Sequence, residues 1–376
     1  MTRTSALSDL RPDTSNNNPV HGTPLNPHNA KYYTGGSSGG SAYAVSTGLV
    51  PFASGADAGG SIRIPSSYCG VYGLKPSHGR VSGNPTLNLA TTCGVDGPIA
   101  ASIADLEIAY RVMATPDPSH PSSSRFPPPR PHSGPRRKLL GIYRTWFDRA
   151  DVPVLDACYA ALDRYKSLGY EVVDITIPLL PEGQTAHAIT SLCEISSAPN
   201  GPLTELSAPT KILVSVGRQT PAQDFLLAQK LRNLLMQHLA YLFTSYPGLI
   251  IVTPTTANAG WRIAGGDADL KYGVSDANVT MRSMEFVWLA NFAGCPALSA
   301  PVGYVDVDGD GEGKLPVGLM GMGEWGSEDA LIEWGRDGEG ILNGNSKEGE
   351  GLRRPEGWVD VLGMAAGALS RDEGAL

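Results

Sequence analysis

Two glycine–serine clusters near the start of the chain constrain its fold more than any other feature. Gly-Gly-Ser-Ser-Gly-Gly fills positions 35–40, and a second cluster fills positions 59–61. Glycine costs backbone entropy when it is ordered, so such clusters are expected where the backbone needs an unusual φ or a close approach. The small residues between them, Ser41 to Thr47, predict a short helix. Residues 35–83 therefore hold the chemically informative part of the chain.

Acyl transfer explains the clusters better than nucleotide binding does. Neither cluster is followed by the lysine of a phosphate-binding loop, and neither shows the strand, G-x-G-x-x-G and acidic residue of a dinucleotide fold. Backbone N–H groups that precede a serine can stabilise a developing oxyanion, and Ala58-Gly59-Gly60-Ser61 has this form. The hydroxyl also needs a base or a relay, for which Ser37 and Ser38 are candidates. Taken singly, each cluster would equally fit a tight turn without chemistry.

The composition favours a soluble globular protein. The 376 residues allow one large α/β domain or two smaller ones, and 41% are hydrophobic. The net charge of −8, with no basic stripe, argues against a nucleic-acid partner. No apolar run resembles a signal peptide or a membrane span, so we expect a cytoplasmic protein with no membrane partner.

Scattered cysteines argue against a disulfide framework or a metal site. The five are single and include no C-x-x-C pair, so free thiols are expected. Cys69 could be a nucleophile, but it has no flanking His or Asn.

Beyond residue 137, strands and helices are predicted to alternate. Lys138–Tyr143, Val152–Leu168 and Tyr170–Ile177 form a strand–helix–strand pattern that predicts a parallel pair. A longer helix, Asp224–Ser245, leads into a strand at Leu249–Val252. Its predicted apolar face comprises Leu227, Leu231, Leu234, Leu235, His238 and Leu242. His238 is interpreted as a hydrogen-bonded core histidine rather than a catalytic one.

The remaining segments are interpreted as loops and a tail. Residues 115–137 are proline-rich and predict an exposed loop. The acidic run from Asp306 imitates a calcium loop, but Val317 stands at its twelfth position, so a hairpin tip between two strands is favoured. Residues 336–376 alternate glycine with charge and should be only partly ordered.

Nearly fifty residues around the clusters resemble the amidase signature. The matching runs are Gly35-Gly-Ser-Ser-Gly-Gly-Ser-Ala-Tyr-Ala-Val, Gly48-Leu-Val-Pro-Phe-Ala-Ser-Gly-Ala-Asp-Ala-Gly-Gly-Ser-Ile-Arg-Ile-Pro and Cys69-Gly-Val-Tyr-Gly-Leu-Lys-Pro-Ser-His-Gly-Arg-Val-Ser. Weaker similarity continues in Gly22-Thr-Pro-Leu-Asn-Pro-His-Asn, Ile251-Val-Thr-Pro-Thr-Thr, Asn291-Phe-Ala-Gly-Cys-Pro-Ala-Leu-Ser-Ala-Pro-Val-Gly and Leu315-Pro-Val-Gly-Leu-Met. The resemblance implies an α/β fold of one large domain, 20–335, with a twisted mixed β-sheet flanked by helices.

The resemblance also implies a serine amidase that needs no metal or organic cofactor and acts on a small-molecule amide through a Ser–cis-Ser–Lys triad. The nucleophile corresponds to Ser61, and the relay serine, preceded by a cis peptide bond, corresponds to Ser37; their spacing (61 − 37 = 24) matches that of the family. The supporting residues carried over are Ser38, Asp57 and Arg63, with an oxyanion hole of N–H groups from Ala58, Gly59, Gly60 and Ser61.

Two departures from the family pattern bear on activity. Ala56 stands where the family usually has threonine. Only 36 residues precede Ser37, fewer than separate the family's catalytic lysine from its relay serine. We therefore expect an N-terminally truncated domain after a polar lead-in, residues 1–19. Lys31 and Lys75 are the nearest lysines, but neither matches the missing position.

Without a terminal proton acceptor, the chain is expected to hydrolyse amides poorly. Two alternatives stay open: a pseudoenzyme that binds without turnover, and an amidotransferase A-like subunit of the kind that works on mischarged glutamyl-tRNA.

Overall fold

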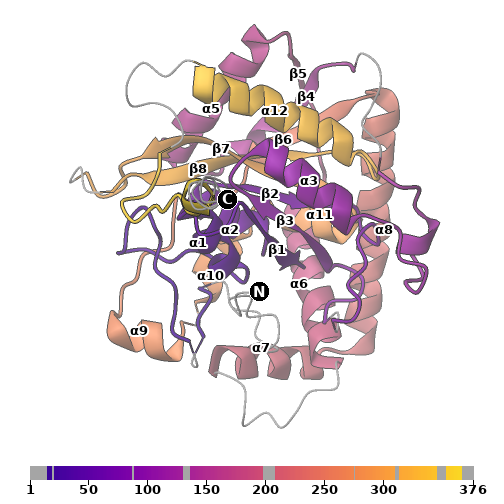
Figure 1. Ribbon diagram of the computed structural model, residues 1–376. Coiled ribbons are helices and arrows are strands. Elements are labelled where there is room, and N and C mark those ends of the chain that lie inside the picture. The colour runs from indigo at the N-terminus through magenta and orange to yellow at the C-terminus, as the bar shows by residue number, and fades with distance from the viewer. Residues whose placement is uncertain are drawn as a thin grey trace, which may run out of the picture.

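A mixed sheet of eight strands forms the centre of the computed structural model, which describes residues 15–18, 21–86, 89–129, 136–197, 208–274, 276–309, 313–344 and 353–365 (Figure 1). The strand order is β1-β3-β2-β7-β8-β6-β4-β5. The strands are β1 (Phe52–Asp57), β2 (Tyr72–Lys75), β3 (Val95–Ala100), β4 (Leu139–Ile142), β5 (Glu171–Asp174), β6 (Leu249–Pro254), β7 (Ala297–Val305) and β8 (Leu315–Met322). The predicted α/β class with one mixed sheet is confirmed.

Parallel pairing is confined to one end of the sheet. Strand β4 pairs in parallel with both β5 and β6, whereas the other neighbouring strands are antiparallel. Helix α5 (Val152–Ser167) connects β4 to β5, with a proline in its first turn. The predicted strand–helix–strand unit is confirmed, although β5 is shorter than expected. Ile175 and Ile177, which follow β5, are buried outside the ladder.

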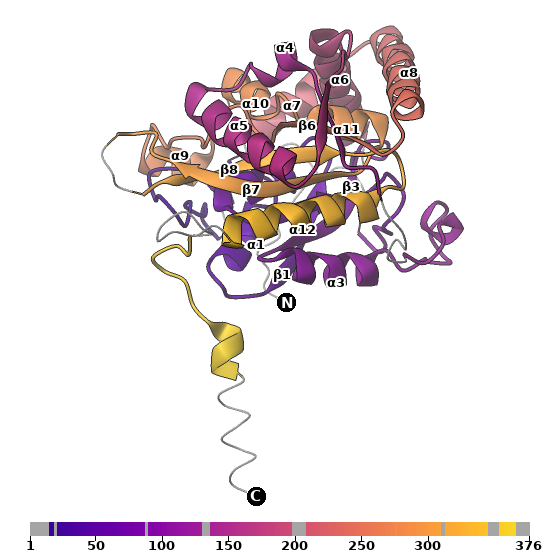
Figure 2. The same cartoon turned by 90° about the horizontal axis from the view of Figure 1, so that it is seen from above.

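The remaining helices cover both faces of the sheet. They are α1 (Gly39–Ser46), α2 (Arg63–Cys69), α3 (Ile103–Met113), α4 (Arg144–Phe147), α6 (Leu180–Ser197), α7 (Ala208–Gln219), α8 (Ala222–Ser245), α9 (Asp267–Tyr272), α10 (Ala277–Ser283), α11 (Trp288–Ala293) and α12 (Glu328–Gly344). A Cβ on Gly318 would meet Ser67 of α2, whereas one on Gly321 would meet Trp334 of α12. Because successive residues of a strand face opposite sides, α2 and α12 cover opposite faces of β8. Helix α12 also contacts α3 and α5, and the three lie along the same side (Figure 2).

Helix α8 differs from the prediction in the face that it buries. Leu235 and Leu242 are buried as expected, but Leu227 and Leu234 are 52% and 55% exposed. The helix packs against α6 and α11, so part of the apolar face predicted from sequence is exposed to solvent instead. His238 is hydrogen-bonded, with Nε2 at 2.6 Å from the Thr176 carbonyl oxygen, but it is half-buried rather than part of the core.

The predicted hairpin forms, whereas the predicted tail begins inside a helix. Strands β7 and β8 form the predicted antiparallel hairpin, whose tip at 310–312 lies outside the described residues, as do 130–135 of the proline-rich loop. Helix α12 crosses residue 335 and continues to Gly344. Residues 353–359 contact the body, where the Val359 N–H donates to the Thr47 carbonyl oxygen at 2.8 Å. The domain limits stay a prediction.

Candidate active site

The two glycine–serine clusters lie side by side in the fold. The Ser38 N–H donates to the Ser61 carbonyl oxygen at 3.2 Å, and this bond joins the start of α1 to the loop after β1. The Gly36–Ser37 peptide bond is cis, as the resemblance implied. Ser37 and Ser61 are half-buried, whereas Ser38 is buried. Two partly accessible serines therefore flank the junction of the clusters.

Hydroxyl groups of α1 hold this junction against the edge of the sheet. Ser38 Oγ lies 3.3 Å from both the N and the O of Ala56, and Ser41 Oγ donates to the Ser54 carbonyl oxygen at 2.8 Å. Within the described residues β1 pairs with β3 alone, so its other edge carries free backbone groups. The two serines satisfy part of that edge and thereby fix α1 beside β1.

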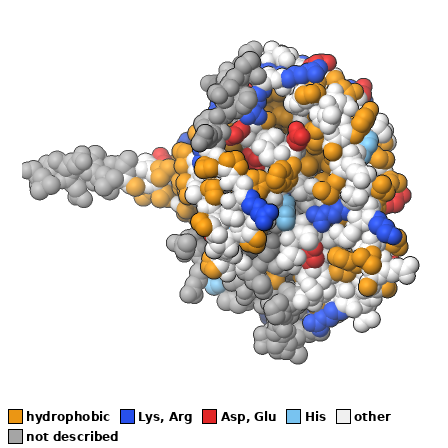
Figure 3. Space-filling model, turned by 90° about the vertical axis from the view of Figure 1, so that its right-hand side faces the viewer, with side chains coloured by type: hydrophobic (Ala, Val, Ile, Leu, Met, Phe, Trp, Pro, Cys, Tyr) orange, Lys and Arg blue, Asp and Glu red, His pale blue; other side chains and the backbone are white. Residues whose placement is uncertain are grey.

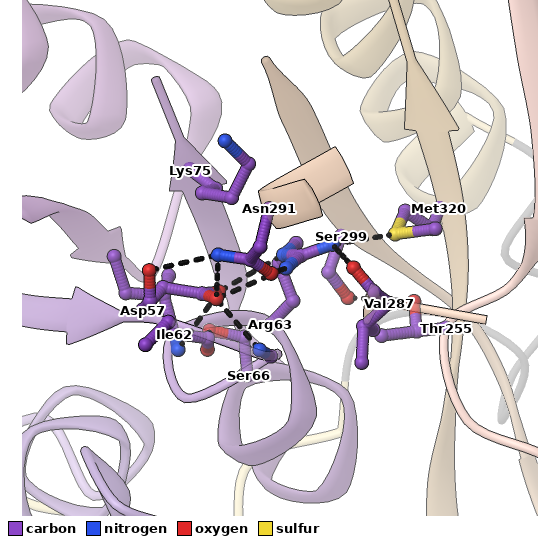
Figure 4. Close-up of polar contacts among 12 residues, drawn as sticks. Asp57, Ile62, Arg63, Ser66, Lys75, Thr255, Val287, Asn291, Ser299 and Met320 are labelled. Carbon is purple, nitrogen blue, oxygen red and sulfur yellow. Dashed lines mark hydrogen bonds and ion pairs between the residues drawn. The ribbon is translucent and has the colours of Figure 1, made fainter. Parts of the chain in front are cut away.

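A buried ion pair braces the loop that carries Ser61 (Figure 4). Arg63 Nε and Nη2 donate to the two carboxylate oxygens of Asp57 at 2.9 and 3.0 Å. Arg63 also donates to the Val287 carbonyl oxygen at 2.8 Å and to Asn291 Oδ1 at 2.6 Å. Burial alone would raise the pKa of Asp57, but the charge and hydrogen bonds of Arg63 outweigh it and lower that pKa. The pair is therefore ionised and fully hydrogen-bonded.

Asp57 also takes one of the N–H groups assigned to the oxyanion hole. Its Oδ1 accepts from the Gly60 N–H at 2.6 Å, and its Oδ2 accepts from the Ile62 N–H at 3.2 Å. The expected role of Gly60 as an oxyanion donor therefore does not fit this structure. The N–H groups of Gly59 and Ser61 show no partner in the described part of the chain, so they stay candidates together with Ala58. The sequence alone did not predict this hydrogen bond, because it depends on the side-chain conformation of Asp57 in the folded protein.

Two further residues contact the loop but had no role in the sequence-based prediction. Asn291 Nδ2 donates to the Asp57 carbonyl oxygen at 2.8 Å, and His187 Nε2 lies 2.8 Å from the Ala58 carbonyl oxygen. Asn291 belongs to a run that resembles the family, which was a usable signal. His187 lies 129 positions from Ala58 in a segment without a motif, so only the fold reveals it.

The two lysines considered from sequence occupy different environments. Lys75 is buried on β2, and its Nζ donates to the Pro76 carbonyl oxygen at 2.9 Å. Its amine points away from Asp57 and Asn291 in Figure 4. Burial, aided by the charge of Arg63, lowers the pKa of Lys75 to about 8. Lys31 is exposed.

The cysteines fit the expectation of free thiols. All five are unpaired, and burial raises the pKa of the Cys69 thiol, which makes a thiolate nucleophile there unfavourable. Among the described residues, no group of three or more His, Cys, Asp or Glu side chains is arranged to hold a metal ion.

Comparison with known proteins decides the family. A family model described as amidase matches residues 6–332. The chain belongs to the amidase family. This agrees with the resemblance carried by the two clusters, and residues 6–332 extend beyond the expected 20–335 at the start.

Curated amidase relatives are similar along most of the chain. A fatty acid amide hydrolase of Medicago truncatula is 37% identical over 365 residues, which cover 93% of this chain and 58% of that protein. The A-type subunit of the glutamyl-tRNA(Gln) amidotransferase of Thermus thermophilus is 32% identical, over 82% of this chain and 68% of that protein. The chain spans only 58% and 54% of the Medicago and Arabidopsis thaliana fatty acid amide hydrolases.

Solved amidase-family structures share the fold. The A-type subunit of the glutamyl-tRNA(Gln) amidotransferase of Thermotoga maritima superposes with a TM-score of 0.72 at 26% identity, covering 90% of this chain and 72% of that one. A structure described as a vestigial protein complex related to an s-triazine catabolic enzyme gives a TM-score of 0.74 at 26% identity.

Proposed function

We propose that this chain is an amidase that cleaves a carboxamide C–N bond through an acyl-enzyme on Ser61. The observation that supports this most is the hydrogen bond from the Ser38 N–H to the Ser61 carbonyl oxygen, which brings the relay segment to the nucleophile loop. The ion pair of Asp57 and Arg63 holds the loop rigid, and Ser61 remains accessible. A rigid loop with an accessible hydroxyl is the arrangement that covalent catalysis needs.

The proposed reaction proceeds in two steps. Ser61 Oγ attacks the carbonyl carbon, its proton passes through Ser37 to a water molecule at the place of the family's lysine, and the oxyanion receives hydrogen bonds from the loop N–H groups. The C–N bond then breaks, and the amine leaves with a proton. Water attacks the ester carbon in the second step, which releases the carboxylic acid and returns the proton to Ser61.

An apolar acyl group fits the surroundings of the loop. Ala58, directly before the glycine pair, packs with Leu89 against the buried side chains of Ala90, Ile195 and Val214. An apolar wall favours a hydrocarbon acyl group over a charged one, because apolar side chains offer a charge neither an ion pair nor a hydrogen bond. The relatives in Medicago, Arabidopsis and rice are named as fatty acid amide hydrolases. We therefore propose long-chain fatty acid amides as first substrates.

The surface supports a small-molecule substrate rather than a nucleic acid. Basic and acidic side chains are interspersed on the face drawn in Figure 3, and the net charge is −8. A phosphate backbone would instead require a concentrated basic surface. Within the described part of the chain, no helix has the length and apolar character to cross a membrane. A cytoplasmic location stays a prediction from sequence.

Ser61→Ala tests the proposed nucleophile. Wild type and variant are incubated with oleamide and with shorter aliphatic and aromatic amides, and the acyl-enzyme is sought by mass spectrometry. Because a terminal proton acceptor is missing, we expect a covalent acyl adduct and only slow turnover, which disappear in Ser61→Ala but persist in the control Ser124→Ala, whose side chain is exposed. Turnover that survives in Ser61→Ala would overturn the assignment. Binding of amides without an adduct or turnover favours the pseudoenzyme.

An ammonia-releasing subunit is the second candidate, because the Thermus relative is 32% identical. Such a protein would release ammonia from glutamine. We expect the apolar wall beside Ala58 to disfavour glutamine, so ammonia release from glutamine that exceeds release from oleamide would favour this candidate over ours.

A further inference from the structure

His187 occupies a position that the proposed mechanism does not yet use. It lies on α6, is 1% exposed, and packs its ring against Trp288 and Phe292 of α11. Its Nε2 lies 2.8 Å from the Ala58 carbonyl oxygen. Its Nδ1 is buried and has no hydrogen-bond partner in the described part of the chain. Because a carbonyl oxygen only accepts, the ring proton is assigned to Nε2.

The ring is neutral under ordinary conditions. Burial lowers the pKa of His187 to about 4. The Ala58 carbonyl and the Asp57 carboxylate raise this pKa by smaller amounts, whereas the charges of Arg63 and Arg232 lower it further. A neutral ring with its proton on Nε2 donates to the Ala58 carbonyl oxygen at 2.8 Å, and the Ser191 hydroxyl lies farther from the same nitrogen, at 3.4 Å.

The hydrogen bond orients one peptide group of the loop. The Ala58 carbonyl and the Gly59 N–H belong to the same trans peptide, in which C=O and N–H point in opposite directions. A donor that holds the carbonyl on the α6 side therefore directs the Gly59 N–H to the other side. Contact is close, since a Cβ on Gly59 would lie 2.9 Å from His187 Cε1 and 2.7 Å from Met284 Cε.

This orientation matters because Asp57 already takes the Gly60 N–H. The Gly59 and Ser61 N–H groups are then the principal donors left for an acyl oxygen near Ser61. We propose that His187 is a positioning residue of the oxyanion hole, which holds the Ala58 carbonyl so that the Gly59 N–H faces the acyl oxygen. The proposal rests on the proposed function of Ser61 and deepens it.

Two substitutions separate the donor from the packing. His187→Phe keeps an aromatic ring against Trp288 and Phe292 but removes the donor. His187→Gln keeps an N–H donor of similar reach. Loss of one oxyanion donor lowers kcat about 10²–10³-fold in serine hydrolases, so we expect His187→Phe to lower kcat by about tenfold to a hundredfold with KM little changed. His187→Gln should restore most of kcat.

The kinetic test uses the full chain with oleamide and, independently of turnover, the rate at which a fluorophosphonate labels Ser61. Equal loss in the Phe and Gln variants would overturn the proposal, because packing rather than donation would then be the cause. Unchanged rates in the Phe variant would overturn it as well. Should His187→Phe not fold, His187→Leu replaces it in the comparison with Gln.

Crystal structures of the variants test the geometry without any activity. We expect the Ala58–Gly59 peptide to rotate in the Phe variant and to keep its orientation in the Gln variant. An unrotated peptide in the Phe variant contradicts the positioning role. Failure of wild type to label or acylate at Ser61 overturns the proposed function instead, and the peptide orientation still decides the role of His187.

Discussion

At the scale of single residues, the pairing of Asp57 with Arg63 links the folding of the loop to its chemistry. Both side chains are fully buried, so each charge depends on the other and on the surrounding amide and carbonyl groups. Removal of one partner from a buried pair costs about 3–5 kcal/mol because the remaining charge is uncompensated. An exposed pair is worth about 1 kcal/mol or less.

Arg63→Met should therefore destabilise the protein by about 3–5 kcal/mol in urea unfolding. It should also weaken fluorophosphonate labelling of Ser61, since Asp57 would no longer be held against the loop. The matched control is Arg144→Met, which breaks the exposed pair with Asp174 and should cost less than about 1 kcal/mol. Equal costs for the two variants would show that the buried pair does not brace the loop.

Burial also makes stability depend on pH through His28. Its Nε2 lies 3.1 Å from the Cys69 carbonyl oxygen, and burial lowers the pKa of His28 to about 4. The unfolded chain binds a proton near pH 6.5, so stability from His28 is complete above that pH and is lost as pH falls toward 4. The neighbouring charge of Arg353 acts in the same direction.

We measure the free energy of unfolding in urea at each pH for wild type and His28→Gln. Between pH 6.5 and 4, the wild-type value should fall by about 2 to 3 kcal/mol more than that of the variant. The comparison with the variant is needed because His187 titrates with the same sign. Burial raises the pKa of Asp96 to about 6, so that group acts with the opposite sign. Parallel curves for wild type and variant would contradict the effect assigned to His28.

At the scale of elements, α8 shows that hydrophobic periodicity predicted the helix but not which of its leucines are buried. Neighbouring leucines of this helix lie in opposite environments, because Leu235 is 1% exposed and Leu234 is 55% exposed. Both positions belonged to the predicted apolar face. The packing of α6 and α11 against one side of α8 decides which leucine is buried.

The same substitution at adjacent positions measures this difference. Leu235→Ala should cost about 2–5 kcal/mol of unfolding free energy, because it leaves a cavity between α8 and α6. Leu234→Ala should change stability by about 0.5 kcal/mol or less. If chemical denaturation gives similar values for both variants, the burial of α8 described above is wrong.

At the scale of the whole molecule, a C-terminal strap returns to the end of α1, the helix that follows Ser37. We define the strap as residues 353–359. The Val359 N–H donates to the Thr47 carbonyl oxygen at 2.8 Å, just after α1. A Cβ on Gly48 would lie 2.2 Å from the Val359 carbonyl oxygen and 2.6 Å from Trp358 Nε1. Residues 360–365, which follow the strap, lie away from the body (Figure 2).

Gly48→Ala should displace the strap by steric collision. Gly48 has a φ of +76°, so alanine there also carries backbone strain. The control Gly22→Ala has a φ of +82° and nothing within 4 Å of the added Cβ, so it carries the strain without the collision. We expect faster hydrogen exchange of residues 353–359 in Gly48→Ala alone. Similar exchange in both variants would mean that strain, not contact with the strap, is responsible.

Local chemistry made part of the fold and site predictable from sequence. The strand–helix–strand unit, the β7–β8 hairpin and α1 follow from periodicity and turn residues, which act over short distances. The cis bond before Ser37 and the adjacency of the two clusters followed from the resemblance.

Tertiary structure alone decided which groups meet across long separations. The donation of the Gly60 N–H to Asp57, the contact of His187 with Ala58 and the buried side of α8 all depend on how elements dock. The sequence by itself determined the chemistry on offer: a serine after a glycine pair, a carboxylate and a guanidinium. Their directions were settled by packing, because a hydrogen bond or a buried face is determined by the position of both partners in space.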